Sequence, residues 1–433
     1  MKFLNTAPLL ARLLVLSLAL SNPANSAPPS TTNTNTADEA SATASPAISP
    51  SPEFETWLAQ LRQDAHQKGI SEQTFDQALA GFQPIPRVIE LDQRQPEFVD
   101  TFWNYLDRRV ENRRVARGRE QLRAHAELLR SVQSQYGIPA SVLVAFWGLE
   151  TNYGGTTGNF SVPLALATLA YDNRRSTFFR RELLNALTIL EQGHISLEDM
   201  NGSWAGAMGQ MQFMPSTFLH YAVDGDGNGR KDIWRSLPDA FHSGANYLKK
   251  IGWRSNEIWG REILLPEGFD FESARLEVKR PLREWVALGV RKADGTPLPR
   301  TNQIGAIVVP QGHEGPAFLV YRNFDVILEW NRSINYALAV GHLADRINGA
   351  PALTLGRNVD NQRLTRDQLM EIQYQLSQFG FDPGNIDGIP GSKTRLAIRA
   401  YQKAAGLPPD GHASASLLEF MKKDSASTGA AGV

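Results

Sequence analysis

Residues 143–155 read Leu-Val-Ala-Phe-Trp-Gly-Leu-Glu-Thr-Asn-Tyr-Gly-Gly, an apolar run that ends in a carboxylate and a glycine turn. Leu143, Phe146 and Trp147 precede Glu150 by seven, four and three residues, so on a helix all four share one face. A carboxyl group on an apolar face is costly to ionise, so we expect its pKa to be raised. Glu150 is therefore a candidate general acid. The alternative is a helix-end Glu that turns into solvent or caps a backbone group.

Composition narrows the classes of protein that need to be considered. The 433 residues are enough for two or three domains with a sizeable core. Lys and Arg number 44 and Asp and Glu 45, so no net field favours nucleic acid or an anionic membrane. The chain has no Cys, which excludes disulfides and thiol chemistry. We therefore expect a partner that is neutral or mixed in charge.

The N-terminus has the features of a targeting segment. Lys2 and Arg12 flank the apolar stretch 13–20, and the small residues of 24–27 follow. This pattern predicts a secretory signal over 1–26, too short to span a membrane stably. No Cys follows the apolar run, so a lipid anchor is not expected at this junction. We expect a soluble, exported, periplasmic protein without a membrane anchor, and a disordered tether over 27–52, where Ser, Thr, Ala, Asn and Pro dominate.

The remaining chain is predicted to be mainly α, in an α+β arrangement. Helical periodicity begins near Phe54 and defines a large domain over 53–349. Short β-branched runs among Gly and Pro between 262 and 330 predict a small β-rich insert within it. A linker is expected over 350–362, a small helical unit over 363–422 and a disordered tail over 423–433. No internal repeat is apparent.

A second informative segment is Asn-Gly-Ser-Trp-Ala-Gly-Ala-Met-Gly-Gln-Met-Gln-Phe-Met-Pro at 201–215. Small residues allow the backbone to approach a ligand closely, and Ser203, Gln210 and Gln212 can bind sugar hydroxyls and acetamides. The alternative is tight packing with incidental Gln side chains. Together with Glu150, the segment is typical of a polysaccharide cleft.

These motifs also carry a resemblance. Glu-Thr-Asn-Tyr-Gly at 150–154, the segment 202–215 and Glu-Trp-Asn-Arg-Ser at 329–333 resemble the B-type lytic murein transglycosylases, which have a lysozyme-like catalytic domain. The likeness extends from about Phe54 to Asn348. It implies that Glu150 is the sole catalytic carboxylate. It implies a substrate-binding role for further residues: Tyr153, Arg174, Arg175, Ser203, Gln210, Gln212, Tyr247, Trp330 and Asn331. The best-known pattern has Tyr where this chain has Trp330.

The resemblance implies a reaction that needs no second carboxylate and no cofactor. Most glycosidases use two carboxylates, and none besides Glu150 stands out in these motifs. Glu150 would protonate the oxygen between N-acetylmuramic acid and N-acetylglucosamine, and then deprotonate the muramoyl 6-hydroxyl to close a 1,6-anhydro ring. Two alternatives stay open: a hydrolytic muramidase that uses the same acid with water, and a non-catalytic wall-binding scaffold.

A third segment, Asp-Gly-Asp-Gly-Asn-Gly-Arg-Lys-Asp at 224–232, matches the first half of an EF-hand loop. Asp224, Asp226, Asn228 and Arg230 are the expected ligand positions. Arg235 stands where a bidentate Glu belongs, and the resemblance makes Asp239 the residue that closes the loop. The segment therefore predicts a structural calcium site. The alternatives are a solvated turn without metal, and a calcium-dependent adhesion or sensor protein.

The C-terminal unit resembles the small helical peptidoglycan-binding domain that is appended to wall enzymes. The matching parts are Leu376, Phe379-Gly380, Asp387-Gly388, Gly391 with Thr394, Tyr401-Gln402, Gly406-Leu407 and Asp410-Gly411. The resemblance implies peptidoglycan glycan strands as the partner and leaves room for contacts with other cell-wall enzymes. A plain stabilising helical tail is the alternative.

Overall fold

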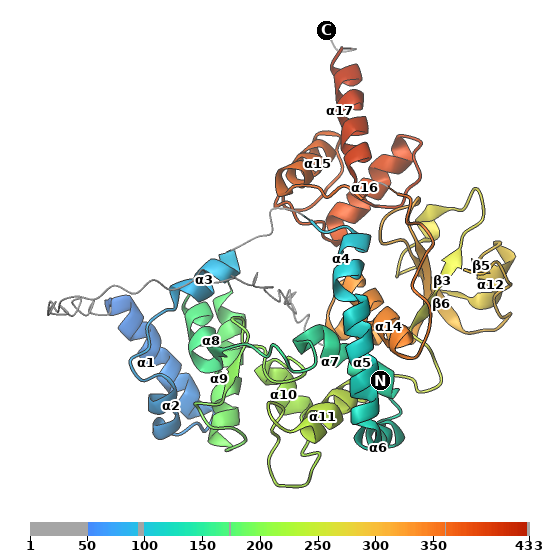
Figure 1. Cartoon of the computed structure of the whole chain (residues 1–433). Coiled ribbons are helices and arrows are strands. Elements are labelled where there is room, and N and C mark those ends of the chain that lie inside the picture. The colour runs from blue at the N-terminus through green and yellow to red at the C-terminus, as the bar shows by residue number, and fades with distance from the viewer. Residues whose placement is uncertain (1–50, 94–98, 173–174, 360, 431–433) are drawn as a thin grey trace, which may run out of the picture.

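The computed structural model describes residues 51–93, 99–172, 175–359 and 361–430, with side chains through Ser425. The expected signal segment, almost all of the tether and Arg174 lie outside the described residues. Helices make up most of the fold and a small sheet lies at one side (Figure 1), which confirms the mainly α class. Within the described ranges, no helix has the length and apolar character needed to cross a bilayer.

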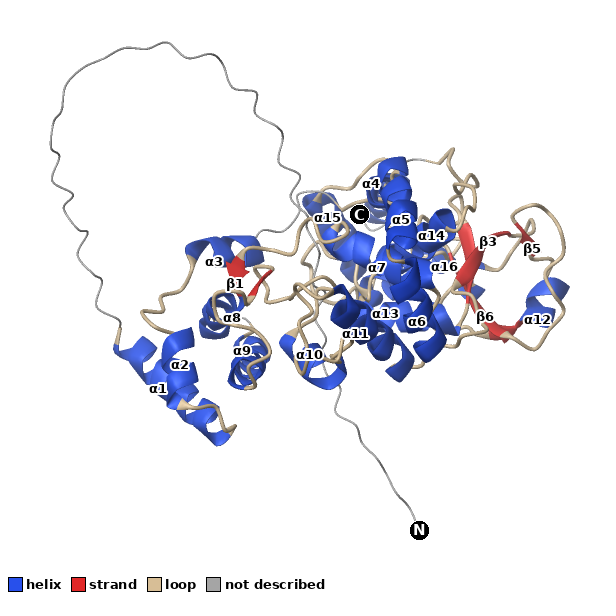
Figure 2. Cartoon of the chain, turned by 60° about the horizontal axis from the view of Figure 1, so that its bottom comes forward, coloured by secondary structure: helices blue, strands red, loops and turns tan. Residues whose placement is uncertain are grey.

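A first lobe contains five helices that frame one side of the molecule (Figure 2). The N-cap hydroxyls of Ser51 and Ser71 accept backbone N–H groups and start the first two of these helices. Phe54, Trp57 and Tyr171 form an aromatic cluster that joins the first helix to the fourth. The bounds are α1 (Pro52–Gln67), α2 (Glu72–Ala78), α3 (Pro86–Gln93), α8 (Val162–Tyr171) and α9 (Ser176–Glu191).

The central helices surround α7 (Ala140–Thr151), which is buried on every side up to its last turn. A helix that is apolar all round must be covered by other elements, and here α5, α6, α11 and α14 pack against it. The bounds of the surrounding helices are α4 (Phe102–Arg109), α5 (Asn112–Ala124), α6 (Ala126–Tyr136), α10 (Pro215–Tyr221), α11 (Leu237–Lys250), α13 (Arg322–Trp330) and α14 (Ile334–Ile347).

The β-rich insert is an antiparallel sheet in the order β4-β6-β7-β3-β5. Trp285 is fully buried against its face and donates its indole N–H to the Gly305 carbonyl at 3.0 Å. The sheet begins at Gly260 and ends at Val320, close to the bounds expected from the sequence. Its elements are β3 (Gly260–Leu264), β4 (Arg280–Pro281), β5 (Arg291–Lys292), β6 (Ile304–Val308), β7 (Ala317–Val320), the 3₁₀ turn η1 (Phe271–Ser273) and α12 (Leu282–Ala287). A separate ribbon pairs β1 (Phe160–Ser161) with β2 (Asn201–Gly202).

The segment expected as a linker is held against the central helices. Trp103 donates its indole N–H to the Gly356 carbonyl at 2.7 Å, and Arg357 forms a bidentate ion pair with Asp107. Beyond it lie α15 (Arg366–Gln378), α16 (Ser392–Ala404) and α17 (Ala415–Ala430). The helix α17 continues to Ala430, past the boundary at 422 after which the sequence predicts a disordered tail. The end of this helix contains no Pro, the residue that breaks a helix most strongly.

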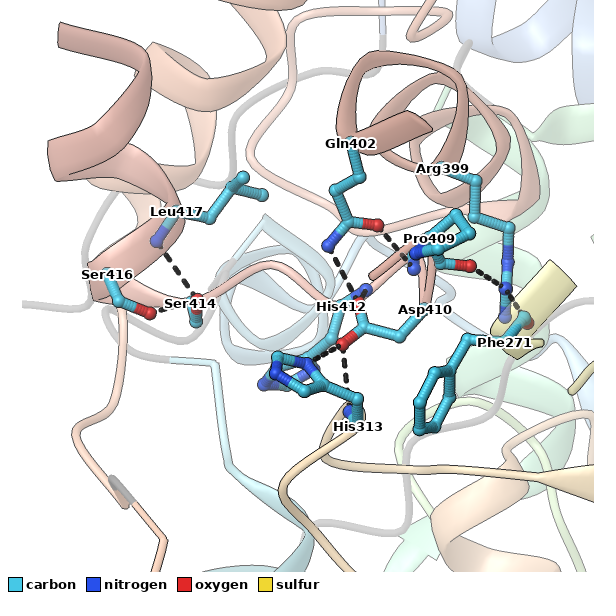
Figure 3. A network of polar contacts seen from close by, with 11 residues as sticks. Phe271, His313, Arg399, Gln402, Pro409, Asp410, His412, Ser414, Ser416 and Leu417 are labelled. Atoms are coloured by element: carbon cyan, nitrogen blue, oxygen red, sulfur yellow. Dashed lines mark hydrogen bonds and ion pairs between the residues drawn. The ribbon is translucent and has the colours of Figure 1, made fainter. Parts of the chain in front are cut away.

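The C-terminal helices contact the β-rich insert through a network of polar groups (Figure 3). The carboxylate of Asp410 accepts the backbone N–H of His313 at 2.8 Å and lies 2.7 Å from its ring Nδ1. Arg399 donates to the carbonyls of Phe271 and Ala274, both at 2.8 Å. Backbone carbonyls and a buried carboxylate are specific partners, so this contact fixes the orientation of the two units.

The docking contact predicts a pH dependence. The hydrogen bond with Asp410 raises the pKa of His313, which is therefore above its ordinary value of about 6.5 in the folded protein. Protonated His313 stabilises the docked arrangement fully at a pH below the ordinary pKa. This stabilisation is lost as the pH rises through the raised pKa. We expect the radius of gyration in X-ray solution scattering to grow as the pH rises above about 6.5 through the raised pKa.

The control for this prediction is His313→Gln, which keeps a side-chain donor but does not titrate. Its radius of gyration should not change over the same pH interval. Below the ordinary pKa of histidine a second group acts. Burial lowers the pKa of His412, so protonation of His412 at low pH opposes docking. Identical pH profiles for the wild type and His313→Gln would contradict the assignment.

Candidate active site

The last turn of α7 delivers Glu150 to the surface of the central helices. Asn152 and Tyr153 follow with φ angles of 51° and 58°, so two consecutive left-handed residues turn the chain sharply away from the helix axis. Arg109 donates to the Leu149 carbonyl at 2.5 Å and satisfies an acceptor that the helix end would leave unpaired. Glu150 is half-buried at this point, as the apolar face of its helix predicts.

Two aromatic donors hold one oxygen of Glu150. The indole N–H of Trp330 donates to Oε1 at 3.0 Å, and the phenol of Tyr336 donates to the same atom. Burial, and then the charge of Glu150, raise the pKa of Tyr336 well above its ordinary value, so the phenol stays protonated and acts as a donor. Phe146 packs on Trp330 at 4.4 Å between ring centroids. Because Oε1 accepts both hydrogen bonds, a proton on the Glu150 carboxyl is favoured on Oε2.

Tyr336 was not among the residues predicted from the sequence. It lies at the start of α14 and is 1% exposed, and 186 positions separate it from Glu150. The only local signal is its place six residues after Trp330, where Ser333 caps the new helix. A Tyr at that position could be taken for an ordinary core residue.

Trp330 is supported from behind by other rings. Its centroid is 5.0 Å from that of Tyr247 and 5.5 Å from that of Phe213. Tyr247 is itself buried. The structure therefore supports a role for Tyr247 in placing Trp330, and direct contact with a substrate stays a prediction.

The small-residue segment faces the loop that follows Glu150. Gln212, at a φ of 50°, donates to the Thr157 carbonyl at 3.1 Å and to the Gly209 carbonyl at 3.0 Å. Gly158 lies so close to Gly202 that a Cβ atom would be 2.1 Å from its carbonyl oxygen, so only Gly fits there. Ser203 Oγ accepts the Ala207 N–H at 3.0 Å and keeps its own proton to donate. The segment and the Glu150 loop therefore form one rigid unit.

Two residues predicted to bind substrate have hydrogen-bond partners within the protein, and their contact with a substrate stays a prediction. Tyr153 is 4% exposed, and its phenol donates to the Arg114 carbonyl at 2.8 Å. Gln210 accepts from the Trp147 indole at 2.8 Å and donates to the Trp234 carbonyl at 2.9 Å, so both ends of its amide are used internally. These residues share the motifs of the site because they fix the loop.

The remaining candidate residues have separate partners. Arg175 forms an ion pair with Asp92 and lies 5.2 Å over the ring of Phe179, and burial lowers its pKa. Asn331 closes a turn before α14, with Oδ1 accepting the Ser333 N–H at 3.1 Å. Their roles toward a substrate stay predictions, as does that of Arg174, which lies outside the described residues.

The acidic loop brings together three of its predicted ligands. Carboxylate oxygens of Asp224, Asp226 and Asp239 lie within 4.8 Å of one another. Burial raises the pKa of Asp239 despite backbone N–H donors at its carboxylate, so this group would gain from a cation. Arg235, which replaces the usual closing Glu, turns away to pair with Asp199. An oxygen set of this kind fits calcium.

Asn228 and Arg230 are not part of the carboxylate cluster. The Asn228 side chain accepts the Arg230 N–H at 2.9 Å and so closes a local turn. Neither residue is placed by this contact to act as a side-chain ligand. Their contribution to a metal site stays a prediction, and at the position of Arg230 an EF-hand loop supplies a backbone carbonyl and not a side chain.

Calcium is expected to raise the melting temperature by several degrees at concentrations well above its dissociation constant, because it binds the folded loop preferentially. Differential scanning calorimetry with calcium and with a chelator measures this shift. In Asp226→Asn the shift should disappear. Asp294→Asn is the matched control, since Asp294 also precedes a Gly in a turn but belongs to no carboxylate cluster of the described residues. Equal shifts in all three proteins would contradict the site.

The fold and the site define a lysozyme-like class of protein, with a glutamate at the end of a buried helix and a facing segment of small residues. Residues 53–345 match the Transglycosylase SLT domain family, and residues 365–421 match the putative peptidoglycan binding domain family. The chain belongs to the SLT transglycosylase family.

Three known proteins show how similar its relatives are. SltB3 of Pseudomonas aeruginosa, solved with NAG-anhNAM-pentapeptide and with NAG-NAM-pentapeptide, is 47% identical with a TM-score of 0.82, over 85% of this chain and 99% of that one. The membrane-bound lytic murein transglycosylase B of Escherichia coli is 31% identical over 52% of this chain and 61% of its own length. Slt35 of Escherichia coli, solved with calcium, is 25% identical with a TM-score of 0.59, over 69% of this chain and 93% of that one.

Proposed function

We propose that this protein is a lytic murein transglycosylase that cleaves the bond between N-acetylmuramic acid and N-acetylglucosamine without consuming water. The observation that carries the proposal is Glu150, half-buried at the end of α7 with Trp330 and Tyr336 donating to one of its oxygens. The similarity to SltB3, of which one structure is a complex with NAG-anhNAM-pentapeptide, supports a reaction that forms an anhydro-muramoyl end.

In the first step Glu150 gives its proton to the glycosidic oxygen, and the bond from that oxygen to C1 of the muramoyl sugar breaks. The substrate's own acetamide stabilises the positive C1, which explains how one carboxylate can suffice. In the second step the Glu150 carboxylate takes the proton of the C6 hydroxyl, and O6 bonds to C1. The glutamate ends as it began, protonated.

The surrounding residues position the sugar. Ser203 offers a hydroxyl and Gln212 an amide oxygen beside the Glu150 loop, and both groups can pair with sugar hydroxyls or an acetamide. The predicted calcium loop stabilises the fold and takes no part in the reaction. Its carboxylates accept backbone N–H groups of the same segment and not of the Glu150 loop. The C-terminal unit holds the enzyme at the wall and raises its local concentration there.

We further propose that the signal segment directs the protein to the periplasm, where its substrate lies. One relative is named a lytic murein transglycosylase, and the 1–26 pattern provides the means of export. The tether would then separate the folded domain from the cleavage point.

The test is mass spectrometry of the products released from purified sacculi. Anhydro-muropeptides, one water lighter than hydrolytic products, are expected from the wild type. Reducing-end products would make the protein a muramidase. Absence of products together with normal pelleting on sacculi would make it a binding scaffold. Glu150→Gln, run in parallel, identifies which products depend on the acid.

A further inference from the structure

The C-terminal unit contains the same turn twice, although the sequence shows no obvious repeat. In the first copy Gln373 accepts the Gly388 N–H at 2.8 Å and donates to Asp387 Oδ1 at 3.2 Å. In the second copy Gln402 accepts the Gly411 N–H at 2.9 Å and donates to Asp410 Oδ1 at 2.8 Å. The two glycines have φ angles of 72° and 73°.

The match extends to the residue after each glycine. The Ile389 N–H donates to Asp387 Oδ1 at 2.9 Å, and the His412 N–H donates to Asp410 Oδ1 at 2.8 Å. In both copies, therefore, Oδ1 of the aspartate closes the turn. The second oxygen, Oδ2, is available for contacts outside the turn.

In the second turn those outside contacts come from the β-rich insert. Asp410 Oδ2 accepts the backbone N–H of His313 and faces its ring Nδ1, at 2.8 and 2.7 Å (Figure 3). Burial opposes ionisation of Asp410, but these donors, together with Gln402 and the His412 N–H, lower its pKa below the ordinary value. The contact leaves the side chain 3% exposed. The turn is therefore shaped to receive a peptide N–H beside a side-chain nitrogen that can carry a proton.

In the first turn the same position is open to solvent. Among the described residues none donates to Asp387 Oδ2, and Asp387 is only partly buried. Ile386 and Ile389 flank it and are 43% and 52% exposed, so two large apolar side chains lie at the surface beside this oxygen. An acceptor between two exposed apolar side chains suits a peptide better than a bare sugar.

We propose that the Asp387 turn binds the stem peptide of peptidoglycan, with Asp387 Oδ2 accepting hydrogen bonds from a peptide N–H and from a side-chain ammonium of that peptide. The contact with His313 provides the template, because Asp410 Oδ2 in the second turn already binds a backbone N–H together with a side-chain nitrogen. Ile386 and Ile389 pack on the aliphatic part of the peptide. This proposal rests on the wall-binding role proposed above for the C-terminal unit. It adds that the stem peptide is the group that is bound and that the Asp387 turn binds it.

The test measures pelleting of the full-length chain on purified sacculi in a Glu150→Gln background, so that the wall is not digested. Asp387→Asn is expected to weaken binding about ten- to hundredfold, the effect of losing charge-assisted hydrogen bonds. The matched control is Asp410→Asn, the same change in the other copy, which should pellet like its parent. Equal loss in both variants, or no loss in Asp387→Asn, would overturn the proposal.

A second measurement leaves the protein unaltered, so that a folding defect cannot mimic the result. Sacculi whose free amines have been acetylated should bind the Glu150→Gln protein about as weakly as untreated sacculi bind the Asp387→Asn variant. Undiminished binding to acetylated sacculi would overturn the role of the ammonium, and failure of the parent protein to pellet would overturn the site as a whole. Because binding is read without turnover, these outcomes are distinct from the product analysis that tests the proposed reaction.

Discussion

Glu150→Gln is expected to lower the rate of anhydro-muropeptide release by about 10²–10⁴-fold, the range over which positioned acids and bases contribute. The amide keeps the size of the side chain and an oxygen that can accept from Trp330 and Tyr336. It cannot give up a proton to the leaving oxygen. Initial rates on purified sacculi, measured by chromatography of soluble products, provide the comparison.

The control for this prediction is Glu329→Gln. Glu329 is an exposed carboxylate adjacent to Trp330 in sequence, in the same motif. We expect its rate to equal that of the wild type, and both variants should melt close to the wild-type temperature. A Glu150→Gln protein that retains the wild-type rate would remove Glu150 from the mechanism.

The position of Glu150 could be predicted because its signal is local. Spacing within α7 fixes which residues share a face with it, and the burial of α7 follows from its composition. The sheet of the insert could be placed for the same reason, since β-branched runs between Gly and Pro coincide with β6 and β7. In each case neighbours in sequence determine the outcome.

The partners of Glu150 depend instead on tertiary packing. Trp330 is 180 positions away and Tyr336 is 186 positions away. The motif resemblance identified Trp330, but no local pattern distinguishes Tyr336 from other buried aromatic residues of α14. Motifs also mix roles, because Tyr153 and Gln210 share segments with the site and yet hydrogen-bond to the protein.

The repeated turn of the C-terminal unit shows a third kind of limit. The two copies of the turn share only a Gln, an Asp and a Gly. The Gln and the Asp are 14 residues apart in one copy and 8 in the other. No fixed period could reveal it. The equivalence lies in hydrogen bonds and in a positive φ, which become visible only once the helices are placed.

Tyr336→Phe is expected to lower kcat by about 10- to 100-fold, with a much smaller effect on KM. A hydrogen bond to a charged group is worth about 1.5–3 kcal/mol, and each 1.36 kcal/mol changes a rate about tenfold. The phenol donates to Glu150 from a fully buried position, so no water can replace it without repacking. Steady-state kinetics on soluble glycan strands would separate the two constants.

A matched variant separates this positioning role from stability. Tyr321→Phe removes the phenol of another buried tyrosine, which lies in the insert and away from Glu150, and should leave kcat unchanged. The pH–rate profile provides the second criterion. The charge of Glu150 raises the pKa of Tyr336, and such coupling is reciprocal, so the phenol must favour the ionised carboxylate. Its removal should move the falling limb of the profile to higher pH, whereas a purely structural role would lower the rate without moving that limb.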